Sequence, residues 1–88
     1  MTIETPFVRE DVVNTLLTNE LVNVYFTKVN GEYREMNCTL HPERLKFFDE
    51  AVVDASSYDS NQVRVFDTDI KEWRSFLMTN LIELTVKS

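Results

Sequence analysis

The single cysteine, Cys38, and the single histidine, His41, are the residues best suited to catalysis. A thiol three residues from an imidazole could act as a nucleophile with its base, or contribute two ligands to a zinc site. A zinc site needs further ligands at suitable spacing, and none follow. Cys38 alternates with Met36 and Leu40, which predicts a buried, inert thiol. His41 precedes Pro42 at the end of a predicted strand, where we expect a capping or surface role.

Two further residue types complete the search for chemistry. Asp67 and Asp69 could bind a cation, although an acid pair in a turn is usually only solvated. Gly31 is the only glycine, which excludes the glycine-rich loops that hold phosphate groups. We therefore expect a protein that is not an enzyme and has no catalytic residues, metal or cofactor.

Length and charge bound the function classes. The chain has 88 residues, 43% of them hydrophobic, which indicates one small globular domain. One cysteine excludes an internal disulfide and fits a reducing cytoplasm. No apolar run approaches the roughly 20 residues that span a membrane, so we expect no membrane partner. The net charge of −6 argues against a broad grip on nucleic acid. An acidic surface could face a basic protein or keep the chain soluble.

A helix is predicted at residues 6–19, with Thr5 as its N-cap and Pro6 at its first position. Its apolar residues recur at helical spacing and form one stripe that needs a surface to cover. These residues are Val8, Val12, Val13, Leu16 and Leu17.

Two strands, about 21–29 and 32–40, flank the stretch KVNGEYRE. A two-residue loop, Asn30-Gly31, would set each apolar row opposite a polar row. A three-residue loop, 29–31, pairs Lys28 with Glu32 and allows Gly31 to take a left-handed conformation. We favour this loop because it gathers the apolar residues on one face. They are Val22, Val24, Phe26, Met36 and Cys38, with Arg34 near the rim.

Residues 41–61 form a variable connection, in which a short helix at 43–53 and a loop folded over the barrel are equally compatible with the sequence. Its apolar residues, Phe47, Phe48, Val52, Val53 and Tyr58, must be buried somewhere. Three short strands follow at about 62–67, 72–78 and 81–87, the last with Ile82, Leu84 and Val86 on one face. Five short strands after a helix predict a mainly β fold, a small SH3/Sm-like barrel preceded by an amphipathic helix.

The segments VYFTKVNGEYREMNCTL (24–40) and QVRVFDTDIKEWRSFLMTNLIEL (62–84) resemble a family of small tailed-phage proteins with an Sm-like SH3 barrel, distantly related to the WYL domain. The resemblance implies this fold and a phage origin, and hence the cytoplasm of an infected bacterium. WYL domains act as regulatory modules that bind ligands or nucleic acid. Arg74 looks like the arginine that precedes their last two strand segments. The WYL tripeptide is absent, and Thr79 and Asn80 stand where a basic residue is expected.

We expect binding to be the activity of this chain. The leading hypothesis is a phage accessory module that contacts a host or phage protein to modulate transcription, nucleic-acid processing or defence. The alternative is a barrel that binds single-stranded nucleic acid with aromatic and arginine side chains. A homo-oligomeric ring formed through strand edges is a third possibility. The candidate binding residues are Tyr25, Tyr33, Arg34, Arg64 and Arg74.

Overall fold

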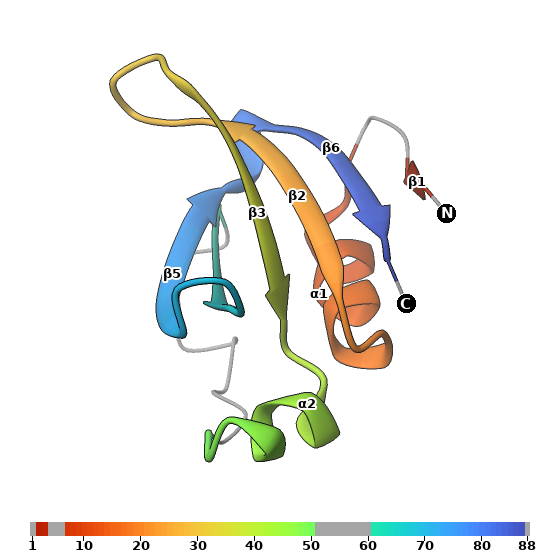
Figure 1. Ribbon diagram of the computed structural model, residues 1–88. Coiled ribbons are helices and arrows are strands. Elements are labelled where there is room, and N and C mark those ends of the chain that lie inside the picture. Colours follow the sequence, from red (N-terminus) through yellow and green to blue (C-terminus); the bar gives the residue numbers. More distant parts are fainter. Residues whose placement is uncertain (1, 4–6, 51–60, 88) are drawn as a thin grey trace.

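The computed structural model describes residues 2–3, 7–50 and 61–87, and it shows one curved antiparallel sheet with two helices (Figure 1). The strands lie in the order β1-β6-β2-β3-β4-β5. Their bounds are β1 (Thr2–Ile3), β2 (Val22–Thr27), β3 (Tyr33–Thr39), β4 (Gln62–Asp67), β5 (Glu72–Leu77) and β6 (Leu81–Val86). A 3-10 turn, η2 (Met78–Asn80), joins β5 to β6. The predicted fold class is confirmed, and β1 is a strand that the sequence did not indicate.

Helix α1 (Arg9–Thr18) lies against the concave side of the sheet (Figure 1). Its Val12 and Leu16 are fully buried in the main core, as the apolar stripe predicts, whereas Val8, which precedes the helix, is 53% exposed. The helix begins three residues later than the predicted position 6. Val8 occupies the N-cap in an extended conformation and offers no side-chain oxygen, while Glu10 and Asp11 lie near the positive end of the helix. The expected cap and first residue, 5 and 6, lie outside the described residues.

The β2–β3 hairpin has the predicted three-residue loop. The backbone N–H of Lys28 donates to the carbonyl of Glu32 at 2.6 Å, and Val24 pairs with Met36. Gly31 has a φ of 88°, the left-handed region that favours glycine. The side chain of Asn30 accepts a hydrogen bond from the N–H of Glu32 at 3.0 Å. The requirement that the apolar residues of both strands share one face therefore identified the register correctly.

A β-bulge in β6 changes the predicted facing of its side chains. The register against β2 slips between Tyr25 and Phe26, so Phe26 pairs with Leu81 and no residue pairs with Ile82. Leu81 and Leu84 both point inward as a result, whereas Ile82 is 40% exposed. The prediction that Ile82 shares the buried face of Leu84 is wrong, because strict alternation does not hold across a bulge.

The buried core lies between α1 and the sheet. It contains two helical residues, Val12 and Leu16, Leu40 just after β3, and apolar residues of every long strand: Val22, Val24, Phe26, Met36, Cys38, Val63, Val65, Phe76, Leu81 and Leu84. Among the described residues, no helix is long and apolar enough to cross a membrane.

Helix α2 (Pro42–Phe47) follows β3 and lies beyond its end, at the bottom of the view in Figure 1. The Nδ1 atom of His41 accepts a hydrogen bond from the N–H of Glu43 at 3.2 Å, so the predicted capping role of His41 is confirmed. Leu45 of this helix is fully buried. Of the two alternatives for the connection, the helix forms, although it is shorter than 43–53. The predicted burial of Phe47 is wrong, because this last residue of α2 is 73% exposed while Leu45 is the buried residue of the helix. The predicted burial of Val52, Val53 and Tyr58 concerns positions outside the described residues.

Candidate functional site

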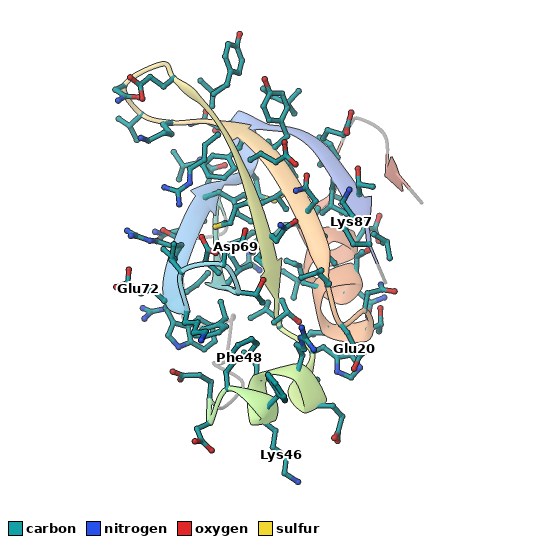
Figure 2. The ribbon with its side chains drawn as sticks, viewed as in Figure 1. Glu20, Lys46, Phe48, Asp69, Glu72 and Lys87 are labelled. Carbon is teal, nitrogen blue, oxygen red and sulfur yellow. The ribbon has the colours of Figure 1, made fainter. Side chains whose placement is uncertain are left out.

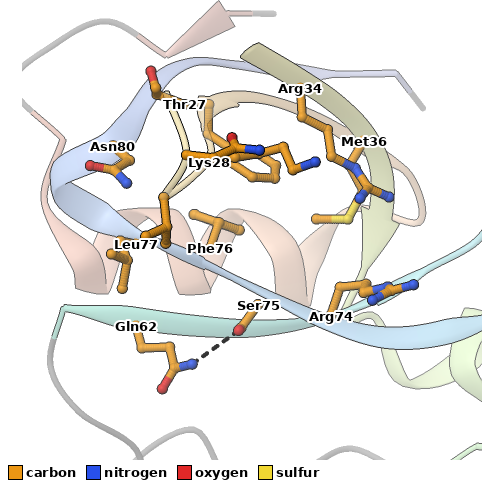
Figure 3. Close-up of a pocket in the computed structure, with 13 residues that line it drawn as sticks. Thr27, Lys28, Arg34, Met36, Gln62, Arg74, Ser75, Phe76, Leu77 and Asn80 are labelled. Carbon is orange, nitrogen blue, oxygen red and sulfur yellow. Dashed lines mark hydrogen bonds between the residues drawn. The ribbon is translucent and has the colours of Figure 1, made fainter. Parts of the chain in front are cut away.

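A groove of about 470 Å³ opens between the β2–β3 hairpin and β5 (Figure 3). It exists because β3 and β4 pair at only two positions, Cys38 with Asp67 and Thr39 with Phe66, whereas β4 pairs with β5 along six. The hairpin arm therefore leaves the sheet and overhangs β5. The volume falls within the roughly 300–1,000 Å³ typical of ligand sites.

The floor of the groove is apolar. The rings of Phe26 and Phe76 stack with their centroids 5.7 Å apart, and Met36 lies beside them. All three side chains are at most 7% exposed. They belong to the main core, so the groove reaches down to the core surface and offers an apolar contact at its base.

Three cations line the groove: Lys28, Arg34 and Arg74. In Figure 3 the guanidinium groups of Arg34 and Arg74 lie at one end, and the Lys28 side chain points toward it. Leu77, Gln62 and Asn80 lie toward the other end. The groove thus has a basic end and a neutral end.

Each cation has a carboxylate within the chain. Lys28 Nζ lies 3.6 Å from Glu32, and Arg74 Nη2 lies 3.1 Å from Glu72. All four of these side chains are at least 40% exposed, so each pair stabilises the fold by at most about 1 kcal/mol. The third pair differs, because Arg34 Nη2 lies 3.5 Å from Asp67, whose side chain is only 3% exposed. Arg34 is thereby held in place, while Lys28 and Arg74 can change partners at little cost.

The outer edge of β5 borders the groove. The N–H of Met78 donates to the carbonyl of Asn61 at 2.6 Å, and this bond shows which alternate residues of β5 hydrogen bond to β4. Bonding alternates along an antiparallel pair, so the peptide groups of Trp73, Ser75 and Leu77 are directed away from β4. In the part of the sheet that the structure describes, β4 is the only strand paired with β5. Ser75 and Leu77 line the groove and bring this open edge to it.

The structure brings Arg34 and Arg74 together in this groove and Arg64 and Arg74 together in a second pocket of about 330 Å³, whereas Tyr25 and Tyr33 lie apart from both. Arg34 and Arg74 meet at the basic end of the groove. Tyr25 and Tyr33 stack at 5.8 Å on the opposite face of the hairpin. Arg64 lies on the outer face of β4, with its guanidinium 5.6 Å from the ring of Trp73.

The tyrosine pair has acidic neighbours. Tyr25 stands between Glu35 of β3 and Glu83 of β6 in the ladder. On the same face, the amide nitrogen of Asn23 donates to Glu35 at 2.8 Å and to Asn37 at 3.0 Å. This face therefore combines exposed aromatic surface with negative charge.

Arg64 belongs to a second apolar cluster, beneath α2. Phe66 is 1% exposed and contacts Phe48 at 5.2 Å and Trp73 at 5.5 Å between ring centroids. The indole N–H of Trp73 donates to Glu50 at 3.1 Å. In Figure 2 the Phe48 ring points toward the sheet, whereas Lys46 points away from it. Phe66 and Phe48 are thus packing residues of this cluster.

Sequence reasoning missed the groove itself. Lys28 was placed at the end of a predicted strand, opposite Glu32, and was not counted among the binding residues. The open edge of β5 follows from pairing that a linear pattern does not reveal. One signal was available: Arg34 and Arg74 each come two residues before a buried apolar residue, Met36 or Phe76, and so mark where each row leaves the core.

The residues that could do chemistry do not assemble. Cys38 is fully buried, and burial raises the pKa of its thiol far above the ordinary range, with the Asp67 carboxylate adding to the rise. The ring of His41 is engaged at the α2 cap. Asp69 accepts a hydrogen bond from Asn37 at 3.1 Å, and Asp67 accepts from two backbone N–H groups. Within residues 2–3, 7–50 and 61–87, no cluster of three or more His, Cys, Asp or Glu residues could hold a metal ion.

Comparison with known protein families gives a match. The profile of the WYL_2 family, described as an Sm-like SH3 beta-barrel fold, matches residues 11–82. Neither a search of curated proteins nor a search of solved structures returned a match. The matched range contains the whole groove and both arginines of its basic end.

Proposed function

Because the chain belongs to the WYL_2 family of Sm-like SH3 barrels, we propose that it is a non-enzymatic module that binds a partner protein through the groove between the β2–β3 hairpin and β5. Open grooves on a small rigid sheet suit segments of another protein, and this groove has an apolar floor and a polar rim. The resemblance to tailed-phage proteins supports a phage accessory role. The partner would be a host or phage protein in the bacterial cytoplasm, bound to modulate transcription, nucleic-acid processing or defence.

The charge balance of the groove carries this proposal. Each of its three cations already has a carboxylate beside it, Glu32, Asp67 or Glu72, which offsets the positive charge of the basic end. Non-specific nucleic-acid binding draws its affinity from neutralising phosphates and releasing their counterions. A groove whose cations are already paired, on a chain of net charge −6, gains little from that source. A protein segment needs only a local polar contact together with apolar burial.

A quantitative capture experiment tests the proposal. The purified chain and two variants, Arg74→Glu and Lys46→Glu, are immobilised and exposed to lysate of phage-infected cells, and the retained proteins are measured by mass spectrometry. Both variants make the same charge change, but Lys46 is exposed on α2, far from the groove. We expect proteins that the parent and Lys46→Glu retain and Arg74→Glu loses. Retention of the same proteins by all three, or of none in repeated trials, would contradict the proposal.

Single-stranded nucleic acid is the second candidate, favoured by the convergence of Lys28, Arg34 and Arg74 at one end of the groove. Fluorescence anisotropy with short labelled DNA and RNA strands at low and physiological salt separates the two functions. Binding with a steep salt dependence, lost in Arg74→Glu, would make nucleic acid the ligand. We expect no binding at low salt.

A further inference from the structure

We infer that the groove takes an extended peptide as an added strand on β5, selecting an acidic side chain two residues from a large apolar one. This inference rests on the proposed protein-binding function and names the chemistry of the partner. It follows from three features: the open strand edge, the spacing of Arg74 and Phe76, and the unequal strengths of the ion pairs.

The open edge supplies main-chain affinity. The peptide groups of Ser75 and Leu77 are directed away from β4 and line the groove. An added strand would lie about 4.8 Å from β5 and hydrogen bond to these two residues. Alternate positions on one strand face the same side, so a short extended segment could hydrogen bond to both peptide groups and still direct side chains into the groove.

The spacing on β5 sets the side-chain pattern. Arg74 and Phe76 are two residues apart, share the inner face of β5, and both line the groove. Residues directly opposite them on an added strand are also two apart and within side-chain contact. The residue opposite Arg74 meets the basic end, and the residue opposite Phe76 meets the apolar floor. A peptide with an acidic residue two positions before or after a large apolar residue fits both the basic end and the apolar floor.

The ion pairs explain why an incoming carboxylate is accepted. The Arg74–Glu72 pair is exposed on both sides, so Arg74 can turn to a new partner at a cost below about tenfold in affinity. Arg34 is held by buried Asp67 through one terminal nitrogen, Nη2, and a guanidinium carries five N–H donors. Arg34 therefore forms a fixed wall of the site, and Arg74 is the adjustable contact.

The test is selection of seven-residue peptides from a random displayed library on the parent chain, with counter-selection on Arg74→Glu. We expect enriched sequences to carry Asp or Glu two positions from Phe, Leu, Ile or Met. A representative peptide is then synthesised with a fluorophore, and its Kd is measured by anisotropy. Arg74→Glu should weaken binding at least about tenfold, as for a desolvated charge contact. Lys46→Glu should leave Kd within twofold of the parent. Exchanging the peptide acid for Lys should restore binding to Arg74→Glu.

A matched pair of variants separates strand addition from simple side-chain docking. Ser75→Pro removes the outward N–H, whereas Ser75→Ala removes only the hydroxyl that accepts from Gln62 at 2.9 Å. Proline is tolerated on an edge strand, and an unchanged urea midpoint confirms that the variant folds. We expect Ser75→Pro to lose binding and Ser75→Ala to keep it. Equal affinities for the two variants, or enriched peptides without the acid-apolar spacing, would overturn the inference.

The remaining outcomes also decide the matter. If no peptide is enriched but groove-dependent capture of lysate proteins succeeds, the inference fails and the proposed function stands. If a peptide binds as expected but groove-dependent capture fails, the proposed function fails and the site chemistry stands. If native mass measurement shows dimers or rings of the parent chain and only monomers of Ser75→Pro, a second copy of this chain is the occupant. That result would overturn the inference.

Discussion

Asp67 holds together the turn between β4 and β5, and its replacement should be the most damaging change to any carboxylate in the described residues. Its Oδ1 accepts hydrogen bonds from the N–H groups of Asp69 at 2.9 Å and Ile70 at 3.3 Å. Its Oδ2 lies 3.5 Å from Arg34. The residue is 2% exposed, so water cannot take over these contacts without a rearrangement of the turn.

The cost of Asp67→Ala can be built from these contacts. A hydrogen bond to a charged group contributes about 1.5–3 kcal/mol, and the shorter of the two backbone bonds should deliver most of that. The longer bond, in an exposed turn, and the ion pair to a partly exposed Arg34 together add about 1 kcal/mol. We therefore expect Asp67→Ala to lower the free energy of unfolding by about 2–4 kcal/mol. Asp67→Asn keeps the Oδ1 acceptor and should cost about half as much.

Urea unfolding followed by the fluorescence of Trp73 measures these values. Trp73 is the only tryptophan, and its ring packs on Phe66, so its emission reports on the β4–β5 pair. Asp69→Ala is the control, because Asp69 is an exposed acid with one side-chain bond, to Asn37, and should cost less than about 1 kcal/mol. Equal losses for Asp67→Ala and Asp69→Ala would refute the assignment of the turn to Asp67. Equal losses for Asp67→Asn and Asp67→Ala would show that charge matters more than the backbone bonds.

Three further predictions test other parts of the fold. Leu84→Ala should lower the free energy of unfolding by about 2–5 kcal/mol and Ile82→Ala by less than about 1 kcal/mol, because the bulge buries Leu84 and exposes Ile82. Similar losses for the two variants in urea unfolding would argue against the bulge. Gly31→Ala should lower the free energy of unfolding by about 1–2 kcal/mol and Gly31→Asn by less. A Cβ at this position meets nothing within 4 Å, so the cost comes only from the left-handed backbone, which Asn tolerates better than Ala. A larger loss for Gly31→Asn than for Gly31→Ala in thermal unfolding would contradict this explanation. Burial raises the pKa of Cys38 above its ordinary 9.0, so its stabilising contribution is present below pH 9.0 and is lost above it as the unfolded thiol ionises. Relative to Cys38→Ala, the parent should lose up to about 1.4 kcal/mol per pH unit above that value, and parallel pH profiles would exclude the effect.

The sequence was most informative where one physical requirement admitted one answer. In the β2–β3 hairpin, a single buried face leaves one register that gathers Val24 with Met36, and the loop length follows from it. The capping role of His41 followed from its place before Pro42. The predicted strands lie within two residues of the observed ones because alternation and turn residues mark both ends.

The sequence was least informative where contacts between distant segments decide the outcome. β1 and the bulge in β6 depend on pairing across the whole chain, and neither leaves a local pattern. The five candidate binding residues were grouped by chemical type. Arg64 and Arg74 belong to opposite faces of the sheet and yet line one pocket beside Trp73, an arrangement that becomes clear only once the β4–β5 register is known. The groove itself arises from the early separation of β3 from β4, a property of two strands that no single segment encodes.

The pairing of β1 with β6 brings the two ends of the chain to the same edge of the sheet, where Thr2 is matched with Thr85 (Figure 1). A segment joined before Thr2 and one joined after Val86 would leave the domain from neighbouring points, on the side away from the β2–β3 hairpin. The two ends could therefore be linked by a short tether and the chain reopened at the exposed Val29, giving a circular permutant with the same strand neighbours. Such a molecule would retain the sheet while freeing the hairpin tip, and so would separate the contribution of the loop to ligand capture from that of the strands.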